Sequence, residues 1–291
     1  MKKVRSKRLC IIGVGLIGGS LARAVREKGL YHEIIGCGRS VANLERAVEL
    51  GIIDNFEQDI GKAVNDCDMV VVAVPLGAFK GVFEQMKDHL PDTAVVTDVG
   101  SAKQSVIEDA KKALGNAYQN FVPGHPIAGT EKSGAEASFA ELFQERRVIL
   151  TPTDDTSVEA VARVRAMWEC TGAEVIDMEP AHHDEVLAAT SHLPHVLAYT
   201  LVDTLAAMSE RDEIFQYAAG GFRDFTRIAS SDPAMWRDIC IANRDAIMKV
   251  LGQYQRDLTA LSQAILNNDE SALFELFSRA KQARDRSINS D

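Results

Sequence analysis

LCIIGVGLIGGSLARA, residues 9–24, joins an apolar run to a glycine-rich turn and then to a helical pattern. Gly13, Gly15 and Gly18 have the spacing GxGxxG, in which the chain turns tightly and brings backbone amides against a pyrophosphate at a helix N-terminus. A strand before the glycines, a helix after them and a second apolar run about 20 residues on complete the pattern of a dinucleotide-binding unit. The predicted dinucleotide contacts in this stretch are Gly13, Gly15, Leu16, Ile17 and Gly18.

Short apolar runs alternate with amphipathic helical segments as far as residue 178, which is the pattern of a parallel sheet with crossover helices. The helical segments end at or near a glycine. We therefore predict an α/β fold whose first domain, residues 1–178, is a Rossmann-type doubly wound parallel sheet. The predicted strands are LCIIGV (9–14), EIIGCG (33–38), MVVVAVP (69–75), AVVTDV (94–99), NFVPGHPI (120–127), RRVILTP (146–152) and AEVIDM (173–178).

No strand pattern follows residue 178, and the rest of the chain reads as long helices over residues 182–209, 231–266 and 269–287. Asp232 and Pro233 have the pattern of a helix start. A helical domain with so little sheet to pack on often completes its core with a second subunit. We predict an all-helical domain over residues 179–291 that contacts substrate and forms a homodimer.

Composition excludes several classes of partner. The net charge of −10, from 42 acidic and 32 basic residues, argues against a general affinity for nucleic acid or anionic membranes. Apart from the glycine-rich start, no apolar run approaches the ~20 residues that span a bilayer. Five cysteines form no CxxC pair, which favours reduced thiols. We expect a cytoplasmic protein, in which any anionic ligand meets a local basic site.

The end of the second predicted strand bears on the choice of coenzyme. NAD enzymes usually place an acid there for the adenosine ribose, but this chain reads GCGRS at residues 36–40. Arg39 and Ser40 could hold a 2′-phosphate, which slightly favours NADP; Arg39 stacked on adenine would leave NAD acceptable, and a solvated loop arginine is the simplest alternative. Val74 and Pro75 end the third predicted strand at the ligand-binding edge and are further predicted coenzyme contacts.

Two reactive side chains follow later predicted strands at the same edge. Ser101 comes after the strand 94–99 and can reach the nicotinamide or a substrate, although it could also cap the next helix. His125 is the second residue of the loop GHPIAGTEKSG, residues 124–134, and a neutral imidazole there can accept the proton of a hydroxyl whose carbon gives up hydride. A histidine that merely satisfies loop carbonyls is the alternative.

Five motifs together identify a family: GVGLIGGSLA (13–22), DVGSAK (98–103), GHPIAGTEKSG (124–134), SHLPH (191–195) and GGFRDFTRIASSDPAMW (220–236). With these motifs the chain resembles, almost end to end, the prephenate and arogenate dehydrogenases of tyrosine biosynthesis. The resemblance implies that hydride leaves C4 of a cyclohexadienol for NAD or NADP, that the ring carboxylate departs as CO2, and that the ring becomes a phenol. The resemblance leaves open whether the substrate carries a keto acid side chain, as in prephenate, or an amino acid side chain, as in arogenate.

The same resemblance implies roles for single residues. His125 matches the histidine that accepts a hydrogen bond from the C4 hydroxyl, and Ser101 matches the serine that helps to orient that hydroxyl. Arg227 matches the arginine that binds a substrate carboxylate. A surface ion pair between Asp224 and Arg227 is the alternative for that arginine.

Further substrate contacts are implied by the helical domain and by the loop. His195 matches a histidine implicated in substrate binding, and His192 ranks second. Thr130 and Glu131 match loop residues near the site, and the glutamate of the family takes part in a polar network that gates access. The histidines at 182, 183, 192 and 195 lack any ligand signature, so we predict no metal site.

Two other functions compete with this interpretation. A β-hydroxyacid dehydrogenase or imine reductase would pair a similar Rossmann domain with helices, but those dehydrogenases need a lysine early in the helical part. Beyond Lys132 the chain has only Lys249 and Lys281, both late. A protein that senses NAD(P) without turnover is the second alternative.

Overall fold

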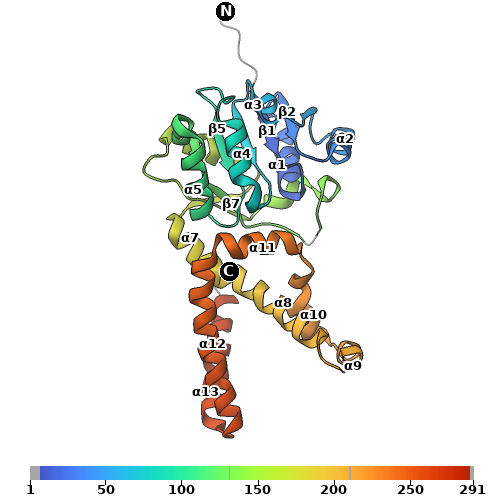
Figure 1. Ribbon diagram of the computed structural model, residues 1–291, viewed down its shortest axis with the longest axis vertical. Coiled ribbons are helices and arrows are strands. Elements are labelled where there is room, and N and C mark those ends of the chain that lie inside the picture. The colour runs from blue at the N-terminus through green and yellow to red at the C-terminus, as the bar shows by residue number, and fades with distance from the viewer. Residues whose placement is uncertain (1–6, 131, 210, 289–291) are drawn as a thin grey trace, which may run out of the picture. The chain divides into compact units, whose positions relative to one another are not determined.

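The computed structural model describes residues 7–130, 132–209 and 211–288 (Figure 1). Contacts divide the chain into two compact units, Met1–Arg244 and Asp245–Asp291. The second unit consists of most of α12 (Arg244–Leu266) and of α13 (Glu270–Ile288), with a turn between them in which Asn268 has a positive φ of 51°. All the predicted site residues belong to the first unit.

A six-stranded parallel sheet forms the centre of the first unit. Its strand order is β3-β2-β1-β4-β5-β6, the order of the dinucleotide-binding doubly wound fold, so the predicted fold class is confirmed. The switch in order between β1 and β4 places the carboxyl ends of these two strands at the edge where ligands bind. The strands are β1 (Arg8–Ile12), β2 (Glu33–Cys37), β3 (Asn55–Glu57), β4 (Met69–Val72), β5 (Val95–Asp98) and β6 (Phe121–Val122).

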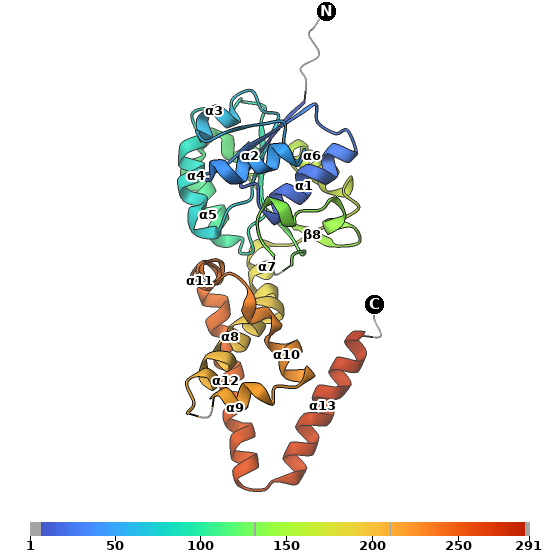
Figure 2. The same cartoon turned by 90° about the vertical axis from the view of Figure 1, so that its right-hand side faces the viewer.

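Nearly every residue of β1, β4 and β5 is buried, without alternation between an inner and an outer face, because helices cover both faces of the sheet. One core packs α1, α2 and α6 on one face, and a second packs α3, α4 and α5 on the other (Figure 2). The covering helices are α1 (Leu16–Glu27), α2 (Val41–Glu49), α3 (Ile60–Val64), α4 (Phe79–Met86), α5 (Gln104–Ala113) and α6 (Val158–Glu169).

Side-chain caps explain where several helices begin. In each, an oxygen of the residue before the first turn accepts a hydrogen bond from a backbone amide of that turn, which satisfies one of the free donors at the helix start. The predicted start at Asp232 and Pro233 is among them and is confirmed. The capping residues are Ser40 for α2, Asp59 for α3, Ser157 for α6, Glu179 for α7 (Pro180–Leu187) and Asp232 for α11 (Pro233–Ala242).

The sheet prediction is wrong at residues 120–127, which form two strands rather than one. β6 ends before Pro123, which has no amide hydrogen to continue the pairing. β7 (Gly124–Pro126) then starts a separate sheet in which it runs antiparallel to β8 (Arg147–Leu150), with β9 (Glu174–Asp177) parallel beside β8. His125, which the sequence analysis placed both in the predicted strand 120–127 and in the loop 124–134, lies in a strand of this second sheet, opposite Ile149. The short, half-exposed strand β3 was not predicted.

The helices after β9 are more broken than the sequence pattern suggests. The predicted helix 182–209 divides into α7 (Pro180–Leu187), a π-helical turn (Ala188–His192) and α8 (Leu193–Ala206). Pro194 lacks the amide hydrogen that a regular ladder would use here, and π-helical turns are frequent at functional sites. The remaining helices of this unit are α9 (Arg211–Gln216), α10 (Gly220–Thr226) and α11 (Pro233–Ala242).

The end of β9 at Asp177 and the start of α7 at Pro180 lie on either side of the predicted domain boundary. The compact units instead divide after Arg244, so the boundary at 178 stays a prediction. Among the helices in the described ranges, none combines the length and the hydropathy needed to cross a membrane.

Candidate active site

A cavity of about 850 Å³ lies at the carboxyl ends of β1, β2 and β4; we call it the glycine cavity. It brings together six of the predicted coenzyme contacts. Leu16 and Ile17 pack instead against the core, and Gly18 is buried behind the turn. The predicted contacts that line the cavity are Gly13, Gly15, Arg39, Ser40, Val74 and Pro75.

The three glycines have different steric reasons for being glycine. Gly13 has φ +99°, and a Cβ on it would lie 2.2 Å from the backbone oxygen of Ala73. A Cβ on Gly18 would lie 2.2 Å from the backbone oxygen of Gly13. A Cβ on Gly15 would meet nothing within 4 Å, so this position faces open space at the N-terminus of α1. The cradle therefore fits a pyrophosphate held by backbone amides.

The adenosine end of the glycine cavity is basic and polar. No Asp or Glu is found among the described residues that line it. Arg39 is exposed at this end, and the Gln58 side chain donates to its backbone oxygen at 3.1 Å. The Ser40 hydroxyl accepts a hydrogen bond from the Asn43 amide at 3.3 Å as the cap of α2, which still leaves its own hydrogen to donate.

A fully buried ion pair lies between the two sheets. Lys103 Nζ is 2.5 Å from Asp98 Oδ2 and also donates to the backbone oxygen of Gly124 at 2.7 Å. Asp98 accepts from the backbone amides of Gly100 and Gly124. Burial raises the pKa of Asp98 and lowers that of Lys103, and the attraction between them opposes each shift. Lys103 and Asp98 both hydrogen-bond the backbone of Gly124, the residue directly before His125.

His125 begins a chain of three hydrogen-bonded side chains. Its Nδ1 is 2.9 Å from Nε2 of His183, whose Nδ1 is 2.9 Å from Oδ1 of Asp184. The Asp184 carboxylate also accepts from the backbone amides of Lys103, at 2.8 Å, and Gln104, at 3.0 Å. These amides begin α5, so Asp184, and not Ser101, supplies the cap of that helix.

Burial sets the charge state of this chain. It lowers the pKa of His125 well below the ordinary histidine value, and repulsion from the positive charge of Lys103, and from His183 and His192 whenever they are protonated, lowers it further. Burial also lowers the pKa of His183, against the opposing effect of Asp184. Burial alone would raise the pKa of Asp184, but hydrogen bonds from His183 and the two α5 amides hold it below its usual range. Both histidines are therefore neutral at neutral pH.

The two histidines of SHLPH occupy different places. His192 is fully buried, its Nδ1 lies 3.0 Å from the Asn243 side-chain nitrogen, and burial lowers its pKa to about 4. His195 is half-buried, stacks on Trp236 with ring centroids 3.7 Å apart, and hydrogen-bonds the Ser191 backbone oxygen. His195 lines a second cavity at this site.

That second cavity, of about 580 Å³, is called the arginine cavity here. It brings Thr130, His195 and Arg227 together from the loop, α8 and the turn after α10. Trp236 forms part of its wall. Arg146, which the sequence did not single out, adds a second guanidinium group, and Glu141 adds an acid. Glu131 lies outside the described residues.

Ser101 and His125 do not line the arginine cavity, although both lie close to its elements. Ile127, two residues after His125, is part of the cavity lining. Ser101 is half-buried, two residues before Lys103, and its backbone lies beside His192.

Several residues of the site were not predicted from sequence. Asp98 and Lys103 lie within the DVGSAK motif, but nothing local shows that they form a buried pair. His183 and Asp184 adjoin the exposed His182, and only the fold shows which of the two neighbouring histidines points inward. Asn243 interrupts a helical pattern and donates to the backbone oxygen of Asp184 at 2.8 Å, which a helix prediction does not register.

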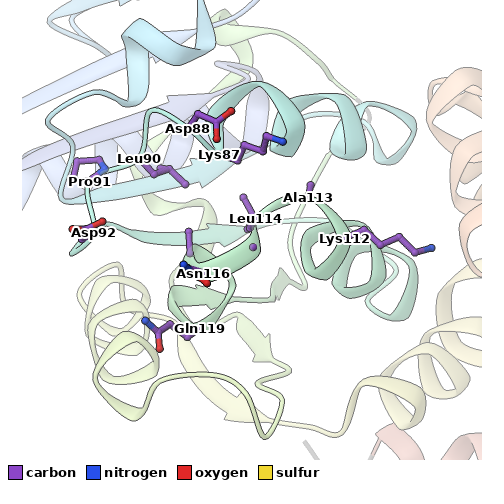
Figure 3. A pocket seen from close by; sticks show the side chains of 12 residues that line it. Lys87, Asp88, Leu90, Pro91, Asp92, Lys112, Ala113, Leu114, Asn116 and Gln119 are labelled. Atoms are coloured by element: carbon purple, nitrogen blue, oxygen red, sulfur yellow. The ribbon is translucent and has the colours of Figure 1, made fainter.

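A third cavity lies away from this site (Figure 3). Its lining comes from the ends of α4 and α5 and from the segment that leads into β5, at the amino edge of the sheet. Ligands of doubly wound folds bind at the opposite, carboxyl edge. In the described parts of the chain, no group of three or more His, Cys, Asp or Glu side chains is arranged to hold a metal ion.

Comparisons with known proteins agree over nearly the whole chain. Residues 21–177 match the model of the prephenate dehydrogenase nucleotide-binding domain, and residues 179–279 match that of the prephenate dehydrogenase dimerization domain. The cyclohexadienyl dehydrogenase of Zymomonas mobilis is 41% identical over 280 residues, which cover 96% of this chain and 95% of that protein.

Two solved structures are similar along nearly their whole length. Prephenate dehydrogenase from A. aeolicus, in complex with hydroxyphenyl propionate and NAD+, has a TM-score of 0.89 and 38% identity, with 100% of both chains covered. Arogenate dehydrogenase from Synechocystis has a TM-score of 0.80 and 30% identity, covering 96% of this chain and 99% of that one.

Proposed function

The chain belongs to the prephenate dehydrogenase family, and we propose that it catalyses the oxidative decarboxylation of prephenate, arogenate or both in tyrosine biosynthesis. The products are 4-hydroxyphenylpyruvate from prephenate and tyrosine from arogenate. The observation that carries this proposal is the neutral His125, hydrogen-bonded through His183 to Asp184, at the sheet edge that also forms the glycine cavity.

The glycine cavity fits a nicotinamide dinucleotide. Gly13 and Gly15 shape the cradle, and the start of α1 offers backbone amides to the pyrophosphate. Val74 and Pro75 line the side nearer the nicotinamide half in folds of this kind. When bound, the coenzyme supplies one function, the acceptance of the hydride that substrate C4 releases.

His125 is the proposed catalytic base. The C4–H bond breaks with both electrons leaving carbon, the hydroxyl proton passes to His125, and C4 becomes a carbonyl carbon. The bond from C1 to its carboxylate then breaks, CO2 departs, and that electron pair completes the aromatic ring. The proton returns to the oxygen, which becomes the phenol. Ser101 is proposed to orient the C4 hydroxyl.

The arginine cavity is the proposed site for the carboxylates of the substrate. Arg227 is proposed to bind one of them, because a guanidinium group matches the two oxygens of a carboxylate. Arg146 lines the same cavity and is proposed to attract the carboxylates of the substrate with it. Together they answer the need for a local basic site in a chain of net charge −10.

The remaining predicted contacts divide between this cavity and its surroundings. His195 and Thr130 line the arginine cavity and are proposed substrate contacts. His192 was the second-ranked contact; its burial favours a supporting role, so His195 is the histidine that we propose for substrate. Glu131 is retained as a proposed gate on the family resemblance alone.

The coenzyme choice that Arg39 favours is NADP, which we propose as the preferred form. Its support is an exposed guanidinium group and a serine hydroxyl at the adenosine end, with no acid in the described lining. NAD is the second candidate, because the A. aeolicus relative was solved with NAD+.

One assay tests the proposed function and both open specificities. Prephenate and arogenate are each combined with NAD and with NADP, and the absorbance of the reduced coenzyme is followed. Turnover in at least one combination, with release of CO2, supports the function. No turnover in any of the four would exclude it. The ratio of kcat/KM with NADP to that with NAD decides the coenzyme proposal.

The assembly and the location are also proposals. A match to a dimerization-domain model over residues 179–279 supports a homodimer formed through the helical domain, with the domain boundary near residue 178. All five cysteines are free thiols, which agrees with a cytoplasmic location. Light scattering at several protein concentrations tests the dimer.

A further inference from the structure

The proton positions in the chain from Asp184 to His125 can be derived in sequence, starting from donors that are fixed. The backbone amides of Lys103 and Gln104 can only donate, and both point at the Asp184 carboxylate. A carboxylate that accepts two amides is ionised and has no hydrogen of its own to give. Asp184 therefore acts as an acceptor toward every neighbour.

His183 is the next group in the chain. Because Asp184 only accepts, the hydrogen in the contact between them must be on His183 Nδ1. His183 is fully buried, and burial keeps it neutral, so a hydrogen on Nδ1 leaves Nε2 without one. Nε2 of His183 is therefore an acceptor.

His125 completes the derivation. Its Nδ1 lies 2.9 Å from that acceptor, so its Nδ1 must carry the hydrogen and donate it. Neutral His125 then has its lone pair on Nε2, the nitrogen that faces away from His183. We propose that His183 and Asp184 are positioning residues, which hold His125 in the tautomer that can take a proton on Nε2.

The other titratable groups around His125 do not disturb this arrangement. Lys103 is held by Asp98 and by the Gly124 backbone oxygen, and His192 is held by Asn243. Neither offers an acceptor for a proton on His125. Once His125 is protonated, its charge is stabilised through His183 by the ionised Asp184, the only negative end of this chain of contacts. The positioning role of His183 and Asp184 rests on the proposed function of His125 as the base. The assignment of the His125 tautomer does not depend on that function.

The tautomer is therefore tested first, in the free enzyme and without substrate. Imidazole nitrogen NMR of the histidine-labelled protein, assigned by comparison with His125→Asn, distinguishes a hydrogen on Nδ1 from one on Nε2. We expect Nδ1–H on His125 in the wild type. Nε2–H in the wild type would overturn the proposal, whether or not the protein oxidises prephenate.

Turnover then tests the positioning role. Asp184→Asn removes the negative charge that stabilises protonated His125, and where the new amide nitrogen faces His183 Nδ1 it also moves the His183 hydrogen to Nε2 and forces Nε2–H on His125. We expect kcat to fall by ~10²-fold or more with KM little changed, because a base in the wrong tautomer loses most of its contribution. His183→Gln, whose amide oxygen can accept from His125, should retain more activity than His183→Leu.

Exposed His182 provides the matched control on the same helix, since it adjoins His183 but faces solvent. His182→Asn should leave both kcat and the NMR signals of His125 unchanged. Equal activities of His183→Gln and His183→Leu in folded protein, as checked by circular dichroism and thermal unfolding, would contradict the positioning role. If the wild type itself turned over no substrate, the proposed function would fail while the tautomer assignment stood.

Discussion

The glycine cavity and the hydrogen-bonded side chains of His125, His183 and Asp184, which we call the histidine chain, lie at the same edge of the sheet but are built in different ways. The cavity depends on backbone: Gly13 and Gly18 admit no Cβ, and Gly15 leaves open space. The histidine chain depends on side chains from two distant segments, since His125 and His183 are 58 residues apart. The first arrangement is local in sequence and steric, whereas the second is tertiary and electrostatic. Substitutions should therefore affect the two regions through different observables.

The largest expected effect is on the histidine side. His125→Asn removes the base while keeping a polar side chain of similar size, so kcat should fall by ~10²–10⁴-fold with KM little changed. Steady-state kinetics with prephenate and the preferred coenzyme measure both constants. Near-normal turnover would show that His125 is not the base. The glycine cavity would then be the only one of the two regions with a proposed function.

The stability of the fold should fall at acid pH because of His192, the buried histidine beside the histidine chain. The folded pKa of His192 is about 4 and the unfolded value about 6.5, so the unfolded chain binds this proton first as the pH falls. The contribution is constant above pH 6.5, and about 3 kcal/mol of unfolding free energy is lost between pH 6.5 and 4. Urea unfolding of wild type and His192→Gln across this range measures it; equal pH slopes for the two proteins would contradict the assignment.

Substrate binding gives the next effect, which separates charge recognition from proton transfer. Arg227→Ala should raise KM for prephenate by ~10–10²-fold and change kcat less, because it removes a charge-assisted contact to a carboxylate. Arg223→Ala, on the exposed side of α10, is the matched control and should leave KM unchanged. An unchanged KM in Arg227→Ala would move the carboxylate site elsewhere.

The smallest effect distinguishes two glycines of the cavity. Gly15→Ala should leave the melting temperature unchanged, because its Cβ meets no atom within 4 Å, but should weaken coenzyme binding roughly tenfold, or about 1.4 kcal/mol. Gly13→Ala should instead lower the melting temperature, since a positive φ and a contact at 2.2 Å destabilise the fold by about 1–3 kcal/mol. Thermal unfolding and coenzyme titration of both variants test the distinction, and equal melting temperatures would contradict it.

How far the sequence predicts each region follows from the same contrast. The glycine spacing and the buried runs of β1, β4 and β5 are local patterns, so the Rossmann fold and its cavity were predictable. The division at Pro123 was not, because an apolar run on both sides of a proline does not show which sheet each half will join. His125 was identified from its place after a predicted strand at the ligand-binding edge, and the family motif then assigned it the C4 hydroxyl, whereas Arg227 was identified through a family motif alone.

The partners of His125 lay beyond local prediction for a physical reason. His183 and its exposed neighbour His182 are identical residue types on one helix, and only packing against β7 buries one of them. Asp184 likewise reads as an ordinary helical acid until the start of α5 is placed against it. Arg146 belongs to none of the family motifs. It reaches the arginine cavity because it directly precedes β8 of the second sheet.

The pH dependence of kcat/KM for prephenate tests the central claim most directly. The ordinary histidine value would place the acid limb near about 6.5, but the burial of His125 moves its pKa lower. Because only the neutral imidazole accepts the proton, activity should be constant from neutral pH down to about 6.5 and fall only at lower pH. That acid limb should disappear in His125→Asn. An inflection at or above about 6.5, or an unchanged profile in His125→Asn, would contradict the assignment of His125 as the base.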